Sequence, residues 1–566
     1  MGLADDVAHQ RYLPFVVNLT QMRNLMVVGL AGSGKTTLVQ SMVYSLCSIY
    51  DPAHLNLYIL SLTSQTLGTL AAFPHVGDIV FDGEEMELRR FVNMLYAELA
   101  RRGELFSAAS TDSFLEYNRA RIKTGQAPEP ALIVFIDRFK QFWDLFSADD
   151  AYNARIQQLI QEGSGRGIHF VVTAMAKTEV PTRCHSFFGG VALQLKEKSD
   201  YTDCIGKRVP YEMPPIATAI GRGMGVLSGG VYEIQVALGG AEPEHEGEGF
   251  DNLEDVERFA IASEIAPVEN PPTDVERAQQ IQAYAKKLAG LWSGARPARV
   301  PRIPQNPTWK MLFEAEGFAA TQKTEFAIPV GFSMVEGSVA SIDIADAPSW
   351  AVYGPRKSGV SNFLKQTARV MKNRGADVYA IGDAGWNLLA EELGIPLYST
   401  PEQIVGFLQM FIERYARARK PLRDAALEKG KTALRRQATQ FAPCCILIDN
   451  AERLYDDFNQ EAYREHMPLM QGLLREIAEK PYYNFLLMAG ISNPKPVSYM
   501  QDPVKSIVAQ GRAIALGGKL AEFDPCNVGA ALPARLRGGA LAKNQGFVGN
   551  NGEAFQIVVP LAELEQ

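Results

Sequence analysis

Short runs of consecutive apolar residues alternate along the chain with stretches whose apolar residues recur at helical spacing. In the first half the apolar runs cover residues 25–28, 55–60, 131–136 and 169–174, and the stretch 38–46 has the helical spacing. In the second half comparable runs cover residues 349–353, 376–381, 444–448 and 484–489. Such short runs are typical of buried strands, and their alternation with helices indicates mostly parallel sheets flanked by helices.

The second half of the chain repeats the first. Each half has a glycine-rich turn after an apolar run, a later apolar run that ends in aspartate, and a closing run at 231–236 or 554–559. The matched positions are Gly29 and Gly354, Ser33-Gly34 and Ser358-Gly359, Thr36 and Ser361, and Asp137 and Asp449. The repeat predicts an α/β protein with two tandem domains of the same fold.

The seam between the halves covers residues 241–308, which leaves domains at 1–240 and 309–566. It opens with an acidic run at 242–255, for which a solvated loop is favoured over a partner-binding segment. A helix is expected from Glu276 to Trp292. Four prolines then stiffen the exit: Pro297, Pro301, Pro304 and Pro307. This composition predicts a semi-rigid linker that contains a helix.

Composition excludes several classes of protein. The 566 residues contain no uninterrupted apolar run of about 18 residues, and the first residues do not resemble a secretory signal. The six cysteines form no C-x-x-C pair and the seven histidines show no ligand spacing, so buried thiols in a reducing compartment are expected. The net charge of −8 supplies no general attraction for nucleic acid.

Residues 29–36 form a complete phosphate loop, Gly-Leu-Ala-Gly-Ser-Gly-Lys-Thr, between an apolar run and a helical stretch. Glycines let the backbone approach a polyphosphate closely, and the lysine adds a positive charge. Candidate nucleotide-binding residues are Gly29, Gly32, Ser33, Gly34, Lys35, Thr36 and Thr37. Thr36 and Asp137 are the candidate ligands of Mg²⁺. Both halves are therefore interpreted as P-loop (RecA-like) NTPase domains, and the first is expected to bind ATP with Mg²⁺.

The first site lacks an obvious base. Asp137 is followed by Arg138, where a motor ATPase usually has glutamate. A general base contributes roughly 10²–10⁴ in rate. We therefore expect weak or no hydrolysis, unless another carboxylate substitutes. An equally simple interpretation of Arg138 is a surface ion pair.

The second site is more degenerate. Val360 replaces the loop lysine, which removes a charged hydrogen bond worth about 1.5–3 kcal/mol, and Lys357 offers partial compensation. Asn450 follows Asp449, with Glu452 two residues further on. Gly359, Ser361 and Asp449 remain as candidate binding residues. A non-hydrolysing relic is the favoured interpretation.

Basic residues gather in two stretches. The first contains Arg89, Arg90, Arg101 and Arg102, and the second contains Arg414, Arg417, Arg419, Lys420, Arg423, Lys429, Lys431, Arg435 and Arg436. Acidic residues intervene in the second stretch. A solvated, salt-bridged helix face is favoured over a nucleic-acid surface.

Three segments carry a resemblance to a known family. Residues 163–174, Gly-Ser-Gly-Arg-Gly-Ile-His-Phe-Val-Val-Thr-Ala, resemble a signature of FtsK/SpoIIIE-type ATPases. Gly221-Arg222-Gly223, followed by Glu233-Ile234-Gln235, resembles the branch found in type VII secretion. Tandem domains with degenerate downstream sites resemble the second and third ATPase domains of the EssC/YukB/EccC family. The resemblance covers nearly the whole chain.

The resemblance implies a function. Members of this family are anchored in the membrane by an N-terminal segment, carry a further ATPase domain upstream, and assemble as hexamers at its cytoplasmic face. They recognise the C-terminal tails of WXG100 substrates for export. The present chain resembles a soluble fragment of such a protein. Arg166 matches a segment that faces a neighbouring subunit, which makes it a candidate catalytic arginine finger, although a structural arginine in a glycine turn is an equal alternative.

Two competing functions stay open. The first is DNA translocation by a member of the same superfamily. Arg138, Asn450 and Val360 argue against it, as does the expectation that residues 560–566 hold no winged-helix module, so DNA is not an expected partner. The second is a non-hydrolysing regulatory module in which ATP stabilises the native state.

Overall fold

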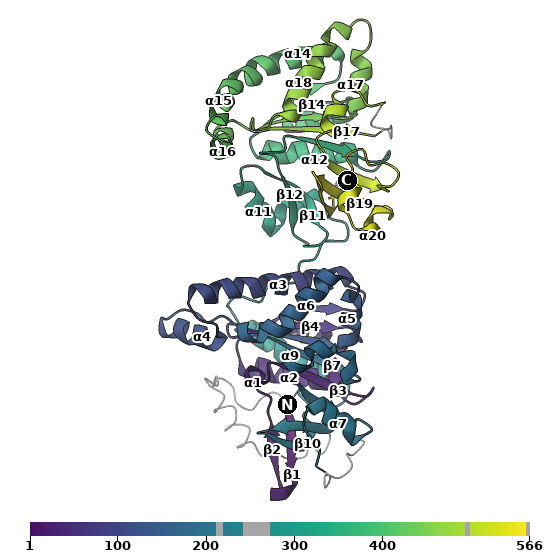
Figure 1. Ribbon diagram of the computed structural model, residues 1–566. Coiled ribbons are helices and arrows are strands. Elements are labelled where there is room, and N and C mark those ends of the chain that lie inside the picture. Colours follow the sequence, from purple (N-terminus) through teal and green to yellow (C-terminus); the bar gives the residue numbers. More distant parts are fainter. Residues whose placement is uncertain (211–218, 241–271, 493–498, 562–566) are drawn as a thin grey trace. The chain divides into compact units, whose positions relative to one another are not determined.

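The computed structural model describes residues 1–210, 219–240, 272–492 and 499–561, so the predicted acidic run at 242–255 and the last five residues lie outside the described part. The chain divides into two compact units, residues 1–301 and 302–566 (Figure 1). Each unit is built on one ten-stranded sheet with helices on both faces. The predicted fold class, two tandem α/β domains, is confirmed.

The sheet of the first unit has the strand order β2-β1-β10-β9-β8-β3-β7-β6-β4-β5. Its strands are β1 (Gly2–Asp6), β2 (Arg11–Phe15), β3 (Asn24–Gly29), β4 (Leu55–Ser61), β5 (Val76–Phe81), β6 (Ala131–Asp137), β7 (Ile168–Ala174), β8 (Phe188–Leu193), β9 (Arg222–Leu227) and β10 (Gly230–Val236). The strands from β8 to β5 run parallel, with β3 between β8 and β7. The carboxyl ends of these strands therefore meet at one edge, where β3 and β6 end at the phosphate loop and at Asp137.

Helices cover both faces of this sheet. They are α1 (Leu19–Met22), α2 (Lys35–Ile49), α3 (Glu85–Ala108), α4 (Phe114–Lys123), α5 (Phe139–Phe146), α6 (Asp150–Glu162), α7 (Lys198–Ile205) and α9 (Asp274–Leu291). The parallel strands are buried on both sides: Leu25 and Val27 pack in the layer with α2 and α9, whereas Met26 and Val28 pack in the layer with α3, α5 and α6. This two-sided burial explains why the strands read as unbroken apolar runs.

Four strands at one edge of the sheet run antiparallel, so the sheet is mixed rather than wholly parallel. A two-residue turn joins β9 to β10, and its central residues Ser228 and Gly229 both have positive φ, 47° and 85°. The second unit repeats this turn at Asn551 and Gly552, with φ of 46° and 92°. Positive φ at both positions is the geometry of the type I′ hairpin turn. Asn-Gly is a residue pair that favours this turn.

The second unit repeats the strand order of the first, as β12-β11-β20-β19-β18-β13-β17-β16-β14-β15. Its strands are β11 (Ala327–Ser333), β12 (Val339–Asp343), β13 (Ser349–Tyr353), β14 (Asp377–Ile381), β15 (Leu397–Tyr398), β16 (Cys444–Ile448), β17 (Phe485–Ile491), β18 (Arg512–Gly518), β19 (Leu541–Asn550) and β20 (Glu553–Val558). Its helices are α10 (Trp309–Glu314), α11 (Glu316–Lys323), α12 (Val360–Asn373), α13 (Asn387–Leu393), α14 (Pro401–Phe411), α15 (Arg417–Leu427), α16 (Lys431–Thr439), α17 (Ala451–Phe458), α18 (Met467–Glu479), α19 (Val504–Val508) and α20 (Ala534–Arg537). A π-helical turn, Ile412–Ala416, joins α14 to α15.

The helix that the sequence placed in a linker packs on the first unit instead. Ile281 and Ala285 of α9 are fully buried, and the Tyr284 ring contacts Tyr44 with centroids 5.3 Å apart. The proline-rich segment after α9 is also docked, since the Tyr58 hydroxyl donates to the Ala298 carbonyl at 2.7 Å. The amphipathic face of α9 explains this placement, because apolar residues at helical spacing need a surface to cover them.

Among the described residues, no helix combines the length and apolar character needed to cross a bilayer. Within the same residues, no group of three or more His, Cys, Asp or Glu side chains is arranged to hold a metal ion. All six cysteines are free and buried, and burial raises the pKa of the Cys204 and Cys444 thiols to about 12.

Candidate functional site

The phosphate loop joins β3 to α2 at the carboxyl edge of the first sheet. Gly32 and Gly34 have φ of 77° and 94°, a region that glycine enters without strain. A β-carbon on Gly29 would lie 2.5 Å from the Ser33 hydroxyl oxygen, so this close turn requires glycine. Ser33 is fully buried, and its hydroxyl has no hydrogen-bond partner among the described residues. Thr37 is half-buried in the first turn of α2.

Lys35 lies folded over the loop. Its ammonium donates to the carbonyl oxygens of Gly29 at 2.6 Å and Leu30 at 2.7 Å. Burial lowers the pKa of Lys35, and the negative charges of Asp137 and Glu179 partly oppose this shift. The cation is thus held at the mouth of the loop.

The Asp137 carboxylate is the centre of the site. It is 2% exposed and accepts hydrogen bonds from three threonine hydroxyls: Thr36 at 3.2 Å, Thr63 at 2.8 Å and Thr173 at 2.7 Å. These threonines come from α2, from the segment after β4 and from β7. Sequence reasoning predicted the Thr36–Asp137 pair but missed Thr63 and Thr173, although both stand at or just beyond the carboxyl ends of apolar runs.

The residues present fit ATP with Mg²⁺. The glycines leave the loop backbone open, because nothing lies within 4 Å of a β-carbon placed on Gly32. Lys35 supplies the charge, while Thr36 and Asp137 bring a hydroxyl and a carboxylate to one point, the oxygen ligands that Mg²⁺ prefers. Arg138 has an exposed side chain, and its backbone N–H donates to the Thr173 hydroxyl at 2.8 Å.

The Gly-Arg-Gly segment at 221–223 lies against the phosphate loop. The Gly221 N–H donates to the Ser33 carbonyl at 3.1 Å. Arg222 pairs with Glu233 at 3.2 Å, which ties the first strand of the β9–β10 hairpin to the second. A motif selected from the sequence by resemblance therefore supports the loop from the antiparallel side of the sheet.

The second loop keeps the backbone of the first. Lys357 and Gly359 have φ of 68° and 100°, close to the values at Gly32 and Gly34. Ser361 donates to Asp449 at 3.0 Å, as Thr36 does to Asp137. The path of the loop has therefore survived in a sequence that lost its lysine.

The side chains around the second loop have changed together. Val360 is buried, and a β-carbon on Gly490 would lie 3.0 Å from its Cγ1 atom. Gly490 holds the position of Thr173 in the strand register, so the hydroxyl is missing there. The Trp386 indole N–H donates to the second oxygen of Asp449 at 2.8 Å. Both carboxylate oxygens are thus satisfied within the protein.

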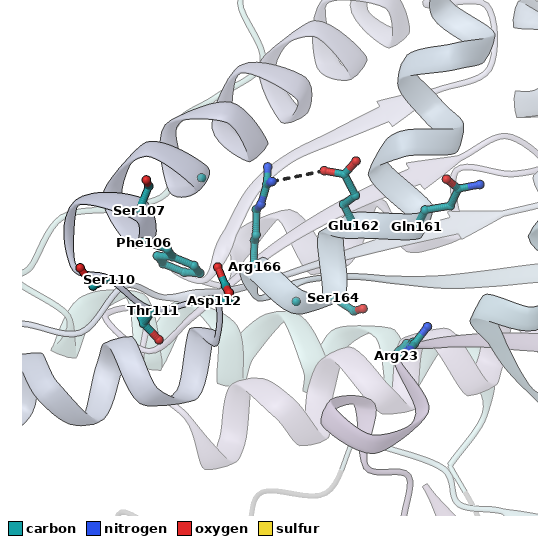
Figure 2. Close-up of a pocket in the computed structure, with 12 residues that line it drawn as sticks. Arg23, Phe106, Ser107, Ser110, Thr111, Asp112, Gln161, Glu162, Ser164 and Arg166 are labelled. Atoms are coloured by element: carbon teal, nitrogen blue, oxygen red, sulfur yellow. Dashed lines mark ion pairs between the residues drawn. The ribbon is translucent and has the colours of Figure 1, made fainter.

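Arg166 lies away from Asp137 of its own unit, because residues 163–166 precede β7 and therefore stand at the amino edge of the sheet. It lines a pocket of about 730 Å³. Figure 2 shows it there with Arg23, Phe106, Asp112 and Glu162. Its guanidinium pairs with Glu162 at 3.3 Å and donates to the Leu99 carbonyl at 2.9 Å. The arginine is thus anchored in its own chain, at the edge of the sheet opposite Asp137.

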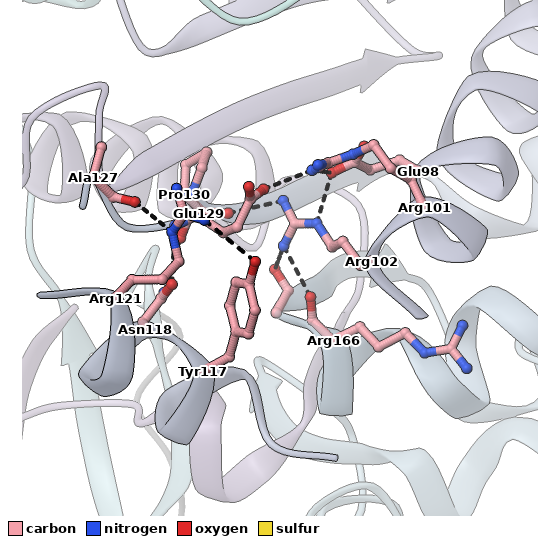
Figure 3. A network of polar contacts seen from close by, with 11 residues as sticks. Glu98, Arg101, Arg102, Tyr117, Asn118, Arg121, Ala127, Glu129, Pro130 and Arg166 are labelled. Atoms are coloured by element: carbon pink, nitrogen blue, oxygen red, sulfur yellow. Dashed lines mark hydrogen bonds and ion pairs between the residues drawn. The ribbon is translucent and has the colours of Figure 1, made fainter. Parts of the chain in front are cut away.

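Four arginines of the two basic stretches are buried, whereas most cations of the second stretch are exposed. Arg102 is 1% exposed and donates to the carbonyls of Arg166 at 2.8 Å and Pro130 at 2.9 Å, while its Nε pairs with Glu98 (Figure 3). Arg419 repeats this arrangement with the carbonyls of Tyr483 and Ala442. The predicted solvated face is wrong for Arg89, Arg90, Arg102 and Arg419, which are buried. Each donates hydrogen bonds to backbone carbonyls or carboxylates of its own unit.

Comparison with known proteins supports the resemblance. The model of the FtsK/SpoIIIE family matches residues 8–200, which lie in the first unit. The chain is 20% identical over 570 residues to the ESX secretion system protein YukB of Bacillus subtilis, covering 99% of this chain and 34% of that protein. It is 22% identical over 367 residues to the EccC protein of Geobacillus thermodenitrificans, covering 64% of this chain and 22% of that protein.

Two solved structures share the tandem fold. EssC (ATPases 2 and 3) from Geobacillus thermodenitrificans matches with a TM-score of 0.68 and 18% identity, covering 100% of this chain and 96% of that one. Thermomonospora curvata EccC (ATPases 2 and 3), solved with a signal sequence peptide, matches with a TM-score of 0.60 and 19% identity, covering 100% and 92%. The predicted resemblance to type VII secretion ATPases is confirmed. The chain spans about a fifth to a third of the length of these curated relatives.

Restoring the lysine alone should not restore the second site. We expect Val360→Lys, added to a Lys35→Ala background that weakens the first site, to bind no more ATP with Mg²⁺ than Lys35→Ala alone, because Asp449 already has two internal donors and Gly490 supplies no hydroxyl. Isothermal titration calorimetry with and without Mg²⁺ measures this. Mg²⁺-dependent binding beyond that of Lys35→Ala alone would contradict the interpretation of a coordinated loss.

Arg102 should matter for stability and not for nucleic acid. Arg102→Met leaves the carbonyls of Arg166 and Pro130 without this donor, while Glu98 keeps Arg101. Each buried acceptor left unsatisfied costs about 1–3 kcal/mol of unfolding free energy. The control Arg101→Met removes a neighbouring side chain that is 46% exposed and should cost less than about 1 kcal/mol. Urea denaturation followed by circular dichroism compares the two, and equal costs would contradict the assignment.

Proposed function

We propose that this chain is part of a type VII protein secretion ATPase, which binds ATP with Mg²⁺ in its first unit and recognises WXG100-type export substrates. The observation that carries the proposal is the meeting of Lys35, Thr36 and Asp137 at one complete phosphate loop, followed by a second unit of the same fold without such a set. The likeness to EssC and EccC supports this assignment.

Each residue has a role in this proposal. The loop backbone and Lys35 hold the β- and γ-phosphates, and Lys35 leaves the Gly29 and Leu30 carbonyls to do so. Thr36 and Asp137 hold Mg²⁺, and Thr63 and Thr173 fix the carboxylate. Bound Mg²⁺ would neutralise charge that develops on the phosphates. Turnover is expected to be slow, because Arg138 stands where a base is needed.

The second unit is the proposed docking site for substrate, and the repeat supports this role. In the first unit, the connector, which is the proline-rich segment after α9, contacts β4 and β5. The Tyr58 hydroxyl of β4 donates to the Ala298 carbonyl, and the Val300 N–H donates to Asp78 of β5 at 3.2 Å. An extended segment of the chain thus already occupies this edge of the first sheet. A relative with the same fold was solved with a signal sequence peptide.

Tyr379 holds the equivalent position in the second unit, opposite Ile446 as Tyr58 is opposite Val134. Its ring lies 5.1 Å from Phe407, as Tyr58 lies 5.3 Å from Phe91. Its hydroxyl pairs with Tyr415 at 2.8 Å instead of with a connector carbonyl. We propose that the C-terminal tail of a WXG100 substrate docks along this edge and accepts a hydrogen bond from the Tyr379 hydroxyl.

Assembly completes the proposal. In the whole protein the units work with an upstream ATPase domain of the same chain, in a hexamer at the cytoplasmic face of the membrane. A ring that places the amino edge of one first unit beside the carboxyl edge of the next would bring Arg166 toward a neighbour's phosphates. Arg166 is therefore proposed to act as an arginine finger between copies.

Two alternatives use the same site. A DNA translocase requires exposed, unpaired cations along a groove. Arg89, Arg90, Arg102 and Arg419 are buried, and most cations of the second basic stretch are exposed. Of those exposed cations, Arg417, Lys431 and Arg435 are paired with carboxylates. A regulatory module without hydrolysis is consistent with Arg138 in place of a glutamate and with Asp449, whose two oxygens both accept hydrogen bonds from within the protein. It predicts thermal stabilisation by ATP with no turnover.

Lys35→Ala tests the nucleotide site. Removing the ammonium should lower ATP affinity about ten- to hundredfold, because a charged hydrogen bond contributes about 1.5–3 kcal/mol. Calorimetry with ATP and Mg²⁺ measures the change. Lys357→Ala, at the exposed cation of the second loop, is the matched control and should leave the tight site intact; unchanged affinity in Lys35→Ala would sink the assignment.

The substrate role is tested by fluorescence anisotropy of a labelled WXG100 C-terminal tail. Saturable binding is expected, and Tyr379→Phe should weaken it about two- to tenfold through loss of one hydrogen bond. Tyr58→Phe in the first unit is the matched control and should leave tail affinity unchanged. No binding of the tail, together with salt-sensitive binding of duplex DNA, would favour the translocase.

A further inference from the structure

The first site needs a carboxylate that its sequence does not supply after Asp137. Hydrolysis requires a group to orient the attacking water and accept its proton. The carboxyl edge of the sheet limits where such a group can stand. β7 lies between β3, which ends at the phosphate loop, and β6, which ends at Asp137. A carboxylate at the end of β7 would therefore stand between the two.

Glu179 occupies that place. It ends a short 3₁₀ turn, Lys177–Glu179, that follows β7. Its Oε2 atom accepts a hydrogen bond at 2.8 Å from the N–H of Met175, the first residue beyond the strand. The side chain is half-buried and is turned back onto the strand end rather than into solvent. The bond fixes one oxygen and leaves Oε1 for another donor.

Glu179 stands at the same edge of the sheet as the phosphate loop and Asp137. The strands β3, β6 and β7 run parallel, so the residues that follow each of them leave the sheet at this carboxyl edge.

The second unit keeps a carboxylate at the same backbone position but takes it from another element. Ser492 is equivalent to Met175 in the strand register, and its N–H donates to Glu452 Oε1 at 3.2 Å. Glu452 belongs to α17, which begins directly after Asn450. The two units therefore reach one arrangement from different places in the sequence.

We infer that Glu179 is the carboxylate that activates water at the first site, an inference that rests on the proposed binding of ATP there. The water oxygen forms a bond to the γ-phosphorus as the bond from that phosphorus to the β,γ-bridging oxygen breaks. The water proton passes to Glu179 and then to solvent. The products are ADP and inorganic phosphate. Arg138 takes no part in the proton transfer.

The test measures two quantities for each variant of the full chain: the rate of phosphate release in a single turnover and the affinity for ATP. Lys35→Ala supplies the background rate of phosphate release. Glu179→Gln can still accept from Met175, so the fold and ATP affinity should be kept, while phosphate release falls about 10²-fold or more. Glu197→Gln, at an exposed carboxylate beyond β8 on the same edge, is the matched control and should release phosphate at the parent rate. Adding Arg138→Glu to Glu179→Gln places a carboxylate directly after Asp137 and should recover much of the loss.

The outcomes distinguish a failure of the role inferred for Glu179 from a failure of the proposed ATP site. Unchanged phosphate release in Glu179→Gln overturns the inference, as does loss of ATP binding in that variant, which would make Glu179 a structural group. Parent protein that binds ATP and releases no phosphate overturns the inference but leaves nucleotide binding standing. Parent protein that binds no ATP overturns the proposed first site itself.

Discussion

The buried carboxylate at the end of β6 is the constraint on which the first site depends. Asp137 is almost fully enclosed, and a carboxylate removed from water must be paired or hydrogen-bonded. Three threonines meet this need, one from the loop helix and two from beside neighbouring strands. Hydroxyls are weak, rotatable donors that can also accept, so this shell can turn toward a cation without leaving a buried charge unpaired.

The second unit meets the same constraint in a way that closes the site. Asp449 keeps the hydroxyl of Ser361 but gains the indole N–H of Trp386, a rigid group that can donate and cannot accept. Val360 then fills the space left free by Gly490. Dense interiors tolerate such coordinated exchange better than single changes.

The sequence allowed the fold and half of the site to be predicted. Two-sided burial makes each parallel strand an unbroken apolar run, and the glycine positions fix the loop, so Gly32, Lys35, Thr36 and Asp137 could be placed beforehand. Thr63, Thr173, Trp386 and Glu179 could not, because they reach the carboxylate or the loop mouth through strand order and loop direction, which no local pattern encodes. Helix α9 was placed in a linker because its burial partner, the surface around Tyr44, is distant in sequence.

A structural difference between the units bears on how the proposed nucleotide site and the proposed substrate site could be coupled. One residue more separates Phe407 from Arg419 than separates the equivalent Phe91 from Arg102, and the π-helical turn at 412–416 absorbs it. That turn carries Tyr415 to the Tyr379 hydroxyl. Because Asp449 is satisfied without a ligand, nucleotide has no evident means of shifting the second unit through its own loop. Under the proposed function, an effect of ATP on substrate binding would originate in the first unit, and by linkage the substrate would alter ATP affinity there by the same factor.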